Sequence, residues 1–100
     1  VIAPLTANTM AKLALGLADD ALTTVFMAIP QPTPVLLAPA MNTEMWAHPV
    51  TQRNRRWLTE LNRYQMADPI SKRLACGDTG VGGLQEVPDL LTAIEALRRS

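Results

Sequence analysis

The feature that most limits the fold is a short apolar run, Val35 to Ala38, which ends at Pro39. An apolar run of this length that is closed by proline is typical of a buried strand, here ending at Ala38. In open α/β sheets, ligands bind outside the carboxyl ends of the strands. The stretch 39–46, called the octet below, is therefore the first place to look for a binding site.

The octet reads Pro-Ala-Met-Asn-Thr-Glu-Met-Trp and mixes one amide with large apolar side chains. Asn42 both donates and accepts hydrogen bonds, so it can hold a carboxylate or the rim of a heterocycle in a fixed orientation. Met41, Met45 and Trp46 offer adaptable or flat apolar surface that suits a conjugated ligand. The alternative is an ordinary strand-to-helix turn, in which these three side chains simply belong to the core.

Composition and charge exclude some functions. One hundred residues make at most one domain, and nine basic and nine acidic residues leave a formal charge of zero. The electrostatic argument for nucleic-acid binding is therefore absent, although four arginines cluster between 53 and 63. We expect these arginines to form a solvated helix face, on which Arg56 and Glu60 can pair.

The single cysteine, Cys76, excludes an internal disulfide and indicates a reducing compartment. No apolar run approaches the roughly 20 residues of a membrane span, and no basic leader precedes Val1, so we expect a cytoplasmic protein without membrane contact. His48 is the only histidine and has no ligand partners nearby, so we expect no metal site and interpret it as a turn residue before Pro49. The chain opens inside a strand-like run without an initiator methionine, which predicts one incomplete domain over 1–100.

Periodicity predicts the remaining elements. A strand ends near Ala3, helices are expected over 8–18 and 21–29, and the proline-rich stretch 30–34 is a stiff connection. Helices are also expected from near Pro49 and near Pro88, with a short strand over 64–67 between them. Asp19 and Asp20 are interpreted as a cap and first-turn charges of the second helix rather than as an acid/base pair.

The start of the first helix carries hydroxyl and amide side chains. Thr6, Asn8 and Thr9 lie where a helix N-terminus presents free N–H groups and its positive dipole end. A phosphate fits such a position, and ordinary N-capping explains the same residues. Both interpretations can hold together.

Four of the five glycines lie in the stretch 73–83. Their spacing fits neither the dinucleotide fingerprint nor the P-loop, so we interpret the stretch as a flexible flap that closes over a ligand. Cys76 on such a flap can serve as an acid, a nucleophile or a redox partner. The alternative is a small buried hydrophobic residue.

Three segments together resemble the flavin-dependent cysteine decarboxylases, most closely those that act on phosphopantothenoylcysteine in coenzyme A biosynthesis. Residues 4–9, Pro-Leu-Thr-Ala-Asn-Thr, resemble the family's flavin-binding motif. The octet matches proline-x-methionine-asparagine-x-x-methionine-tryptophan, and residues 75–82 resemble the clamp that recognises the substrate.

This resemblance implies a flavodoxin-like, three-layer α/β/α fold with a parallel sheet and FMN as cofactor. It also implies a homo-oligomer, a trimer or a dodecamer, that converts 4'-phosphopantothenoylcysteine into 4'-phosphopantetheine by thiol oxidation, loss of carbon dioxide and re-reduction. By the same resemblance, Asn42 would grip the carboxylate that leaves, and Cys76 would donate a proton to the product. The residues carried over for FMN are Thr6, Ala7, Asn8, Thr9 and Ala40, and those for the substrate are Asn42, Met45, Ala75 and Gly77.

The chain departs from the family pattern at several points. Thr6 stands where serine is usual and keeps the hydroxyl, whereas Gly83 and Leu84 stand where arginine and methionine commonly close the clamp. The family's catalytic histidine belongs to an N-terminal half without a counterpart here, and His48 does not occupy its place. The competing interpretations are a flavin-fold subunit that assembles or regulates without catalysing, a peptidyl-cysteine decarboxylase and a flavin prenyltransferase.

Overall fold

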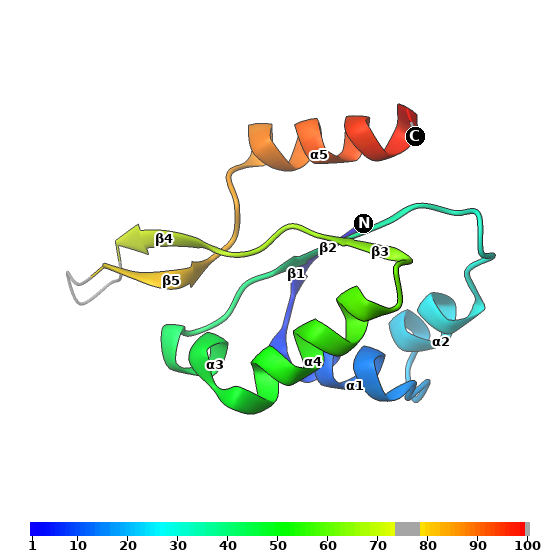
Figure 1. Ribbon diagram of the computed structural model, residues 1–100, viewed down its shortest axis with the longest axis horizontal. Coiled ribbons are helices and arrows are strands. Elements are labelled where there is room, and N and C mark those ends of the chain that lie inside the picture. The colour runs from blue at the N-terminus through cyan, green and yellow to red at the C-terminus, as the bar shows by residue number, and fades with distance from the viewer. Residues whose placement is uncertain (74–78, 100) are drawn as a thin grey trace.

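The computed structural model describes residues 1–73 and 79–99 (Figure 1). Ala75, Cys76 and Gly77, for which the sequence predicts site roles, lie outside the described residues. In chain order the elements are β1 (Ile2–Leu5), α1 (Ala7–Leu15), α2 (Ala21–Ala28), β2 (Val35–Pro39), α3 (Thr43–Ala47), α4 (Pro49–Glu60), β3 (Tyr64–Met66), β4 (Ile70–Arg73), β5 (Thr79–Gly83) and α5 (Val87–Arg99). None of the described helices is long and apolar enough to cross a membrane.

The main sheet is parallel, with the order β1-β2-β3. Ile2 pairs with Leu37, and Val35 pairs with Tyr64, so β2 is the central strand. All residues of β2 are buried, which confirms the prediction made from its uninterrupted apolar run.

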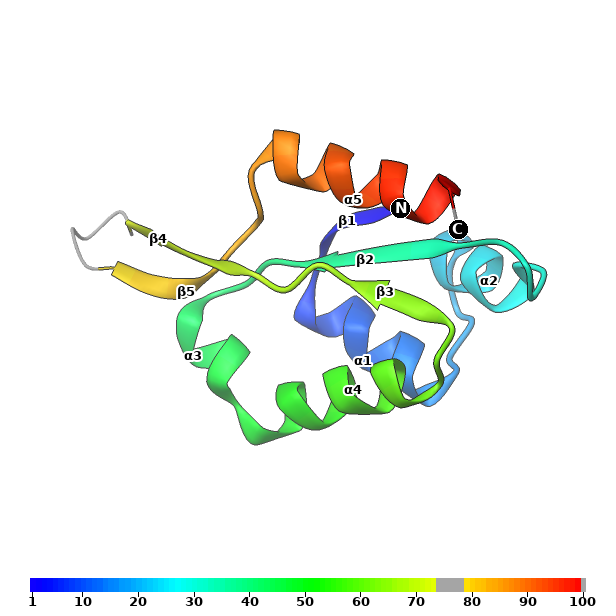
Figure 2. The same cartoon turned by 45° about the horizontal axis from the view of Figure 1, so that its top comes forward.

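Successive side chains of β2 point to opposite faces and divide the core in two. Val35 and Leu37 belong to a cluster on the face covered by α1, α2 and α4, with Leu5, Met10, Leu13, Phe26 and Leu58. Leu36 and Ala38 belong to a second cluster, which α5 closes through Leu90. Figure 2 shows the sheet between the two helical layers, the α/β/α arrangement that the resemblance implied.

The predicted start of α2 is confirmed. Asp20 is the N-cap, its carboxylate accepts a hydrogen bond from the Thr23 backbone N–H at 2.8 Å, and the Thr23 hydroxyl completes a capping box. The predicted end of α1 at Ala18 is wrong, because the helix ends at Leu15. Gly16 adopts a left-handed φ of 75°, and the Leu17 N–H turns back to the Lys12 carbonyl at 2.9 Å.

The glycine-rich stretch departs furthest from expectation. The sequence predicts a flexible flap over 73–83 without a strand, whereas Thr79–Gly83 forms β5, which pairs antiparallel with β4 (Figure 1). Leu84, after the end of β5, packs against the cluster beneath α5. The described part of the glycine-rich stretch is therefore an ordered hairpin strand that leads into the last helix.

Candidate functional site

The start of α1 and the start of the octet lie together at the carboxyl edge of the sheet. The sequence predicts a turn from Pro4 onward, but β1 continues to Leu5, which pairs with Pro39. The Ala40 N–H then donates to the Leu5 carbonyl at 3.1 Å. This hydrogen bond places Ala40 beside Leu5 and thus near Thr6, the next residue. The two residues predicted for the same cofactor therefore lie close together.

Thr6 is the N-cap of α1. Its Oγ1 accepts a hydrogen bond from the Thr9 N–H at 3.2 Å and lies 3.1 Å from the Thr9 hydroxyl. The N–H groups of the first helical turn, from Ala7 and Asn8, have no acceptor within a helix. No acidic residue occupies this turn, so the positive end of the helix dipole is not neutralised locally.

Asn42 is the N-cap of α3. Its side-chain oxygen accepts hydrogen bonds from the backbone N–H groups of Glu44, at 2.8 Å, and Met45, at 3.4 Å. The residue is exposed, so its NH₂ group is left to donate to a ligand. The cap thus holds the Asn42 oxygen at the start of α3, so the NH₂ group is the part of the amide that the cap does not use.

The two interpretations of the apolar residues in the octet each hold for part of it. Met41 and Trp46 are half-buried and pack against the core cluster beneath the sheet. Met45 is 48% exposed and remains available to a ligand. Met41 and Trp46 therefore anchor the octet to the core, and Met45 leaves apolar surface accessible.

Strand β5 lies against the octet, a contact that the sequence did not predict. The Met41 N–H donates to the Gly82 carbonyl at 2.8 Å. Gly80 lies directly over Thr43, whose hydroxyl oxygen is buried without a hydrogen-bond partner among the described residues. A glycine-rich sequence could signal such a close approach, but nothing in it identifies the partner.

The four clustered arginines are mostly structural, so the prediction of a solvated face is wrong for three of them. Arg55 makes a bidentate pair with Asp68, at 2.8 and 2.6 Å, and this hydrogen bonding raises the pKa of the Arg55 guanidinium. Arg53 stacks 4.4 Å above the ring centroid of Trp57, and Arg63 donates to the Ile29 carbonyl. Only Arg56 is exposed, and it pairs with Glu60 at 3.8 Å as predicted.

His48 caps α4, which confirms its interpretation as a turn residue. Its Nδ1 accepts a hydrogen bond from the Val50 N–H at 3.1 Å, and its side chain is exposed. Within residues 1–73 and 79–99, no group of three histidine, cysteine, aspartate or glutamate side chains is placed to hold a metal ion.

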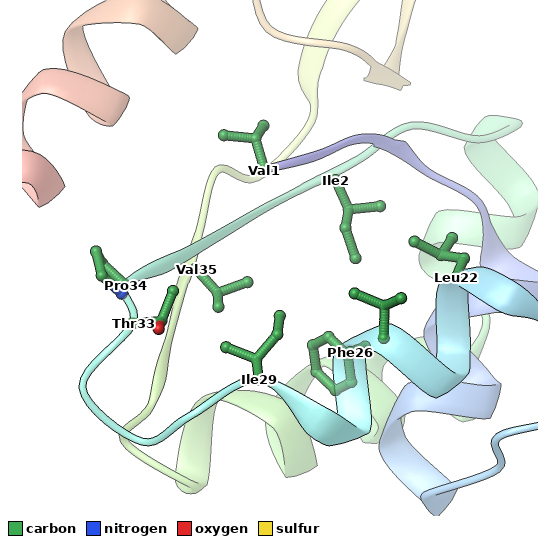
Figure 3. A pocket seen from close by; sticks show the side chains of 9 residues that line it. Val1, Ile2, Leu22, Phe26, Ile29, Thr33, Pro34 and Val35 are labelled. Atoms are coloured by element: carbon green, nitrogen blue, oxygen red, sulfur yellow. The ribbon is translucent and has the colours of Figure 1, made fainter.

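An apolar hollow of about 200 Å³ lies away from this site (Figure 3). It is formed where β1 and β2 begin, between Ile2, Val35 and the side of α2 that carries Phe26. These residues are at the amino ends of the strands, whereas Thr6 and Asn42 follow the carboxyl ends. The hollow has few polar groups and does not fit a phosphate.

Comparisons with known proteins find a matching family model, curated relatives and similar solved structures. A family model described as Flavoprotein matches residues 1–99. A phosphopantothenoylcysteine decarboxylase of Arabidopsis thaliana is 50% identical over 91 residues, which are 91% of this chain and 43% of that protein. The chain spans about half or less of the length of the curated relatives that it matches.

Two solved structures are similar throughout the chain. A mutant PPC decarboxylase complexed with pantothenoylaminoethenethiol superposes with a TM-score of 0.91 at 42% identity, covering 99% of this chain and 54% of that one. The FMN binding protein AtHal3 gives a TM-score of 0.83 at 44% identity, covering 95% and 51%. These likenesses confirm the expected fold class.

Proposed function

The chain belongs to the Flavoprotein family, and from this premise we propose that it is part of an FMN-dependent enzyme that decarboxylates 4'-phosphopantothenoylcysteine. The observation that carries the proposal is the geometry of Asn42, an exposed residue whose oxygen is used by the helix cap while its NH₂ group has no hydrogen-bond partner among the described residues. A group held in this way is suited to orienting a carboxylate. The family relationship and the names of the relatives support the same chemistry.

The donor set at the start of α1 fits the cofactor. Backbone N–H groups of the first turn, the hydroxyls of Thr6 and Thr9 and an uncompensated helix dipole suit an anionic or hydrogen-bond-accepting group. Thr6, Ala7, Asn8, Thr9 and Ala40 are the residues that would hold FMN. When bound, FMN supplies the reversible two-electron oxidation that turns the thiol carbon of the substrate into an electron sink.

Asn42 would hold the substrate carboxylate through its NH₂ group. A neutral donor fixes the direction of the carboxylate without adding a counter-charge that would stabilise the carboxylate against leaving. Met45 would provide apolar contact beside it, because nearly half of its side-chain surface is free. Loss of carbon dioxide then requires that the oxidised thiol carbon of the substrate accept the electrons of the broken carbon–carbon bond.

The remaining roles rest on the resemblance of residues 75–82 to the family's clamp. Cys76 would protonate the product, and Ala75 and Gly77 would contact the substrate. By the same relationship, the whole protein would be a homo-oligomer, a trimer or a dodecamer, with FMN at subunit contacts.

A non-catalytic flavin-fold subunit is the second candidate, and Gly83 is the observation that favours it. This glycine stands where the resemblance expects a clamp arginine. A larger residue here would require the Lys72 side chain to move, since a Cβ on Gly83 would lie 2.6 Å from Lys72 Cδ. A related peptidyl-cysteine decarboxylase or flavin prenyltransferase is the remaining alternative within the enzyme class.

Asn42→Asp in the full-length protein tests the role of Asn42. Aspartate caps a helix as well as asparagine does, so the thermal midpoint should stay close to that of the wild type. The carboxylate of the substrate would now meet a like charge, which costs several kcal/mol and lowers kcat/KM for carbon dioxide release on the order of 100-fold.

Glu44→Gln is the matched control, because it changes one charge on the same short helix without touching the cap. It should leave carbon dioxide release near the wild-type rate. An Asn42→Asp enzyme that is as active as the wild type would remove Asn42 from the site. A wild-type protein that binds FMN but never releases carbon dioxide would favour the non-catalytic subunit.

A further inference from the structure

The hairpin of β4 and β5 meets the octet through its glycines rather than through side chains. The register of the two strands pairs Ile70 with Gly83 and Ser71 with Val81, so it skips Gly82. Gly82 is therefore the extra residue of a β-bulge, and its carbonyl is turned out of the ladder to accept the Met41 N–H at 2.8 Å. The octet thus receives one backbone hydrogen bond directly before Asn42.

Gly82 tolerates no larger residue in this position. Its φ of 146° is one that residues with a side chain rarely adopt, and a Cβ would lie 2.2 Å from the Met41 carbonyl oxygen. The obstructing atom is backbone, so it cannot rotate aside. A side chain at this position would push the hairpin and the octet apart.

Gly80 makes the second contact, with the first residue of α3. A Cβ at Gly80 would lie 2.5 Å from the Thr43 hydroxyl oxygen and 3.3 Å from the Thr43 methyl carbon. Thr43 is β-branched and stands at the start of a helix, so its side chain has few alternative rotamers. Among the described residues, the buried Thr43 hydroxyl has no hydrogen-bond partner, so its removal breaks no hydrogen bond that the structure describes.

We propose that Gly80 and Gly82 are positioning residues that hold the hairpin on the octet and thereby fix the orientation of the Asn42 amide. The two contacts flank Asn42, since Met41 precedes it and Thr43 follows it. Asn42 itself gives its oxygen to the cap of α3, so displacing either neighbour moves the amide. This inference rests on the proposed role of Asn42 only for its effect on catalysis, because the contact itself is a property of the free protein.

The test compares Gly80→Ala, Gly82→Ala, Thr43→Ala and the double variant Gly80→Ala with Thr43→Ala, all in the full-length protein. Gly83→Ala is the matched control from the same strand, because its Cβ would meet the side chain of Lys72 on β4 and no atom of the octet. Hydrogen exchange of the Met41 amide measures the contact without any ligand. Steady-state carbon dioxide release gives kcat and KM separately.

Gly80→Ala and Gly82→Ala should speed Met41 amide exchange by at least about tenfold, since the hydrogen bond opens locally while the core stays protected. KM should rise as the donor is misplaced. The double variant should match Thr43→Ala alone in Met41 exchange rate and in KM. The reason is that Thr43→Ala removes the hydroxyl oxygen and the methyl carbon that the new Cβ at position 80 would approach. Thr43→Ala should not rescue Gly82→Ala, because the atom that obstructs a Cβ at Gly82 belongs to the Met41 backbone. In Gly83→Ala, the Met41 amide should exchange at the wild-type rate.

Unchanged Met41 exchange in Gly80→Ala, or a double variant as impaired as Gly80→Ala itself, would overturn the proposal. Uniformly faster exchange across the core in both glycine variants would also overturn it, because it would show a general loss of stability. If the wild type releases no carbon dioxide while the exchange pattern is as described, the proposed function fails and the contact stands.

Discussion

At the scale of single residues, Thr6 is both the N-cap of α1 and a residue of the proposed FMN site. Its hydroxyl satisfies the Thr9 N–H, and no acidic side chain in the first turn competes for the remaining N–H groups. The same arrangement starts the helix and leaves a row of donors at the carboxyl edge of the sheet. Structural capping and cofactor binding are therefore compatible at this residue.

Thr6→Ala should lower both stability and affinity for FMN. Loss of the cap costs about 1 kcal/mol in the free energy of unfolding without FMN. The added stability that FMN confers should also shrink, because the affinity for FMN falls. Urea unfolding of the full-length protein with and without FMN measures both quantities.

Thr6→Ser is the control for this prediction, since it keeps the hydroxyl and removes only a methyl group. It should stay within a few tenths of a kcal/mol of the wild type in both conditions. A Thr6→Ala protein that loses stability but keeps the full stabilisation by FMN would restrict Thr6 to capping.

The sequence allowed good prediction of residues whose role depends on near neighbours. Asp20 and His48 could be interpreted from the residues that follow them, because caps are local. The contacts of Gly80 with Thr43 and of Arg55 with Asp68 could not, since each joins segments that only the fold brings together. Asn42 lies between these cases. Its cap joins near neighbours, but only the structure shows that the oxygen is used by the cap and the NH₂ group is not.

At the scale of elements, the junction of α1 and α2 depends on charges at their ends. Asp20 caps α2, and Lys12, in the last turn of α1, lies 3.2 Å from Asp19 and 3.6 Å from Asp20. The backbone N–H and hydroxyl of Thr23 lower the pKa of the Asp20 carboxyl, with help from Lys12. The ionised form of Asp20 is therefore the form that the folded protein prefers.

This lowered pKa predicts a contribution to stability that depends on pH. It is fully present above the ordinary pKa of 3.8 and is lost as the pH falls through the lower pKa of the folded state. Asp20→Asn keeps an N-cap oxygen but does not titrate. The difference in unfolding free energy between wild type and Asp20→Asn should therefore shrink between about pH 5 and pH 2.

Glu60→Gln is the control, because it removes a carboxylate from an exposed pair on α4 that caps no helix. Chemical unfolding at a series of pH values gives the curves. A difference between wild type and Asp20→Asn that stays constant over the whole pH range would show that the carboxylate charge of Asp20 contributes nothing.

Helices and strands were predicted correctly where the apolar periodicity agreed with residues that typically start or end an element. The prolines before β2 and the aspartates before α2 defined both starts. The end of α1 was misplaced because Leu17 and Ala18 continue the apolar period beyond Gly16, so only the left-handed backbone reveals the stop. β5 was missed because its glycines carry no alternating pattern, and its pairing with β4 is set by the backbone.

At the scale of the whole molecule, the site depends on parallel strands that end together. β1 and β2 bring Thr6 and Ala40 to one edge of the sheet, and the β4–β5 hairpin (Figure 2) is hydrogen-bonded to the octet through Gly82 and Met41. The apolar hollow at the opposite end of the strands carries none of the predicted site residues. The described residues that we propose for the site therefore follow the carboxyl ends of these strands, where ligands bind in open α/β sheets.

The most direct test of the proposed function is the visible absorption spectrum of the full-length protein, recorded without oxygen before and after addition of 4'-phosphopantothenoylcysteine. An FMN-dependent decarboxylase should show flavin absorption bands when purified, transient bleaching on addition of the substrate, and carbon dioxide released as the bands bleach and recover. Flavin bands that do not respond, with no carbon dioxide, would contradict the enzymatic claim. A colourless protein that cannot be loaded with FMN would contradict the cofactor as well.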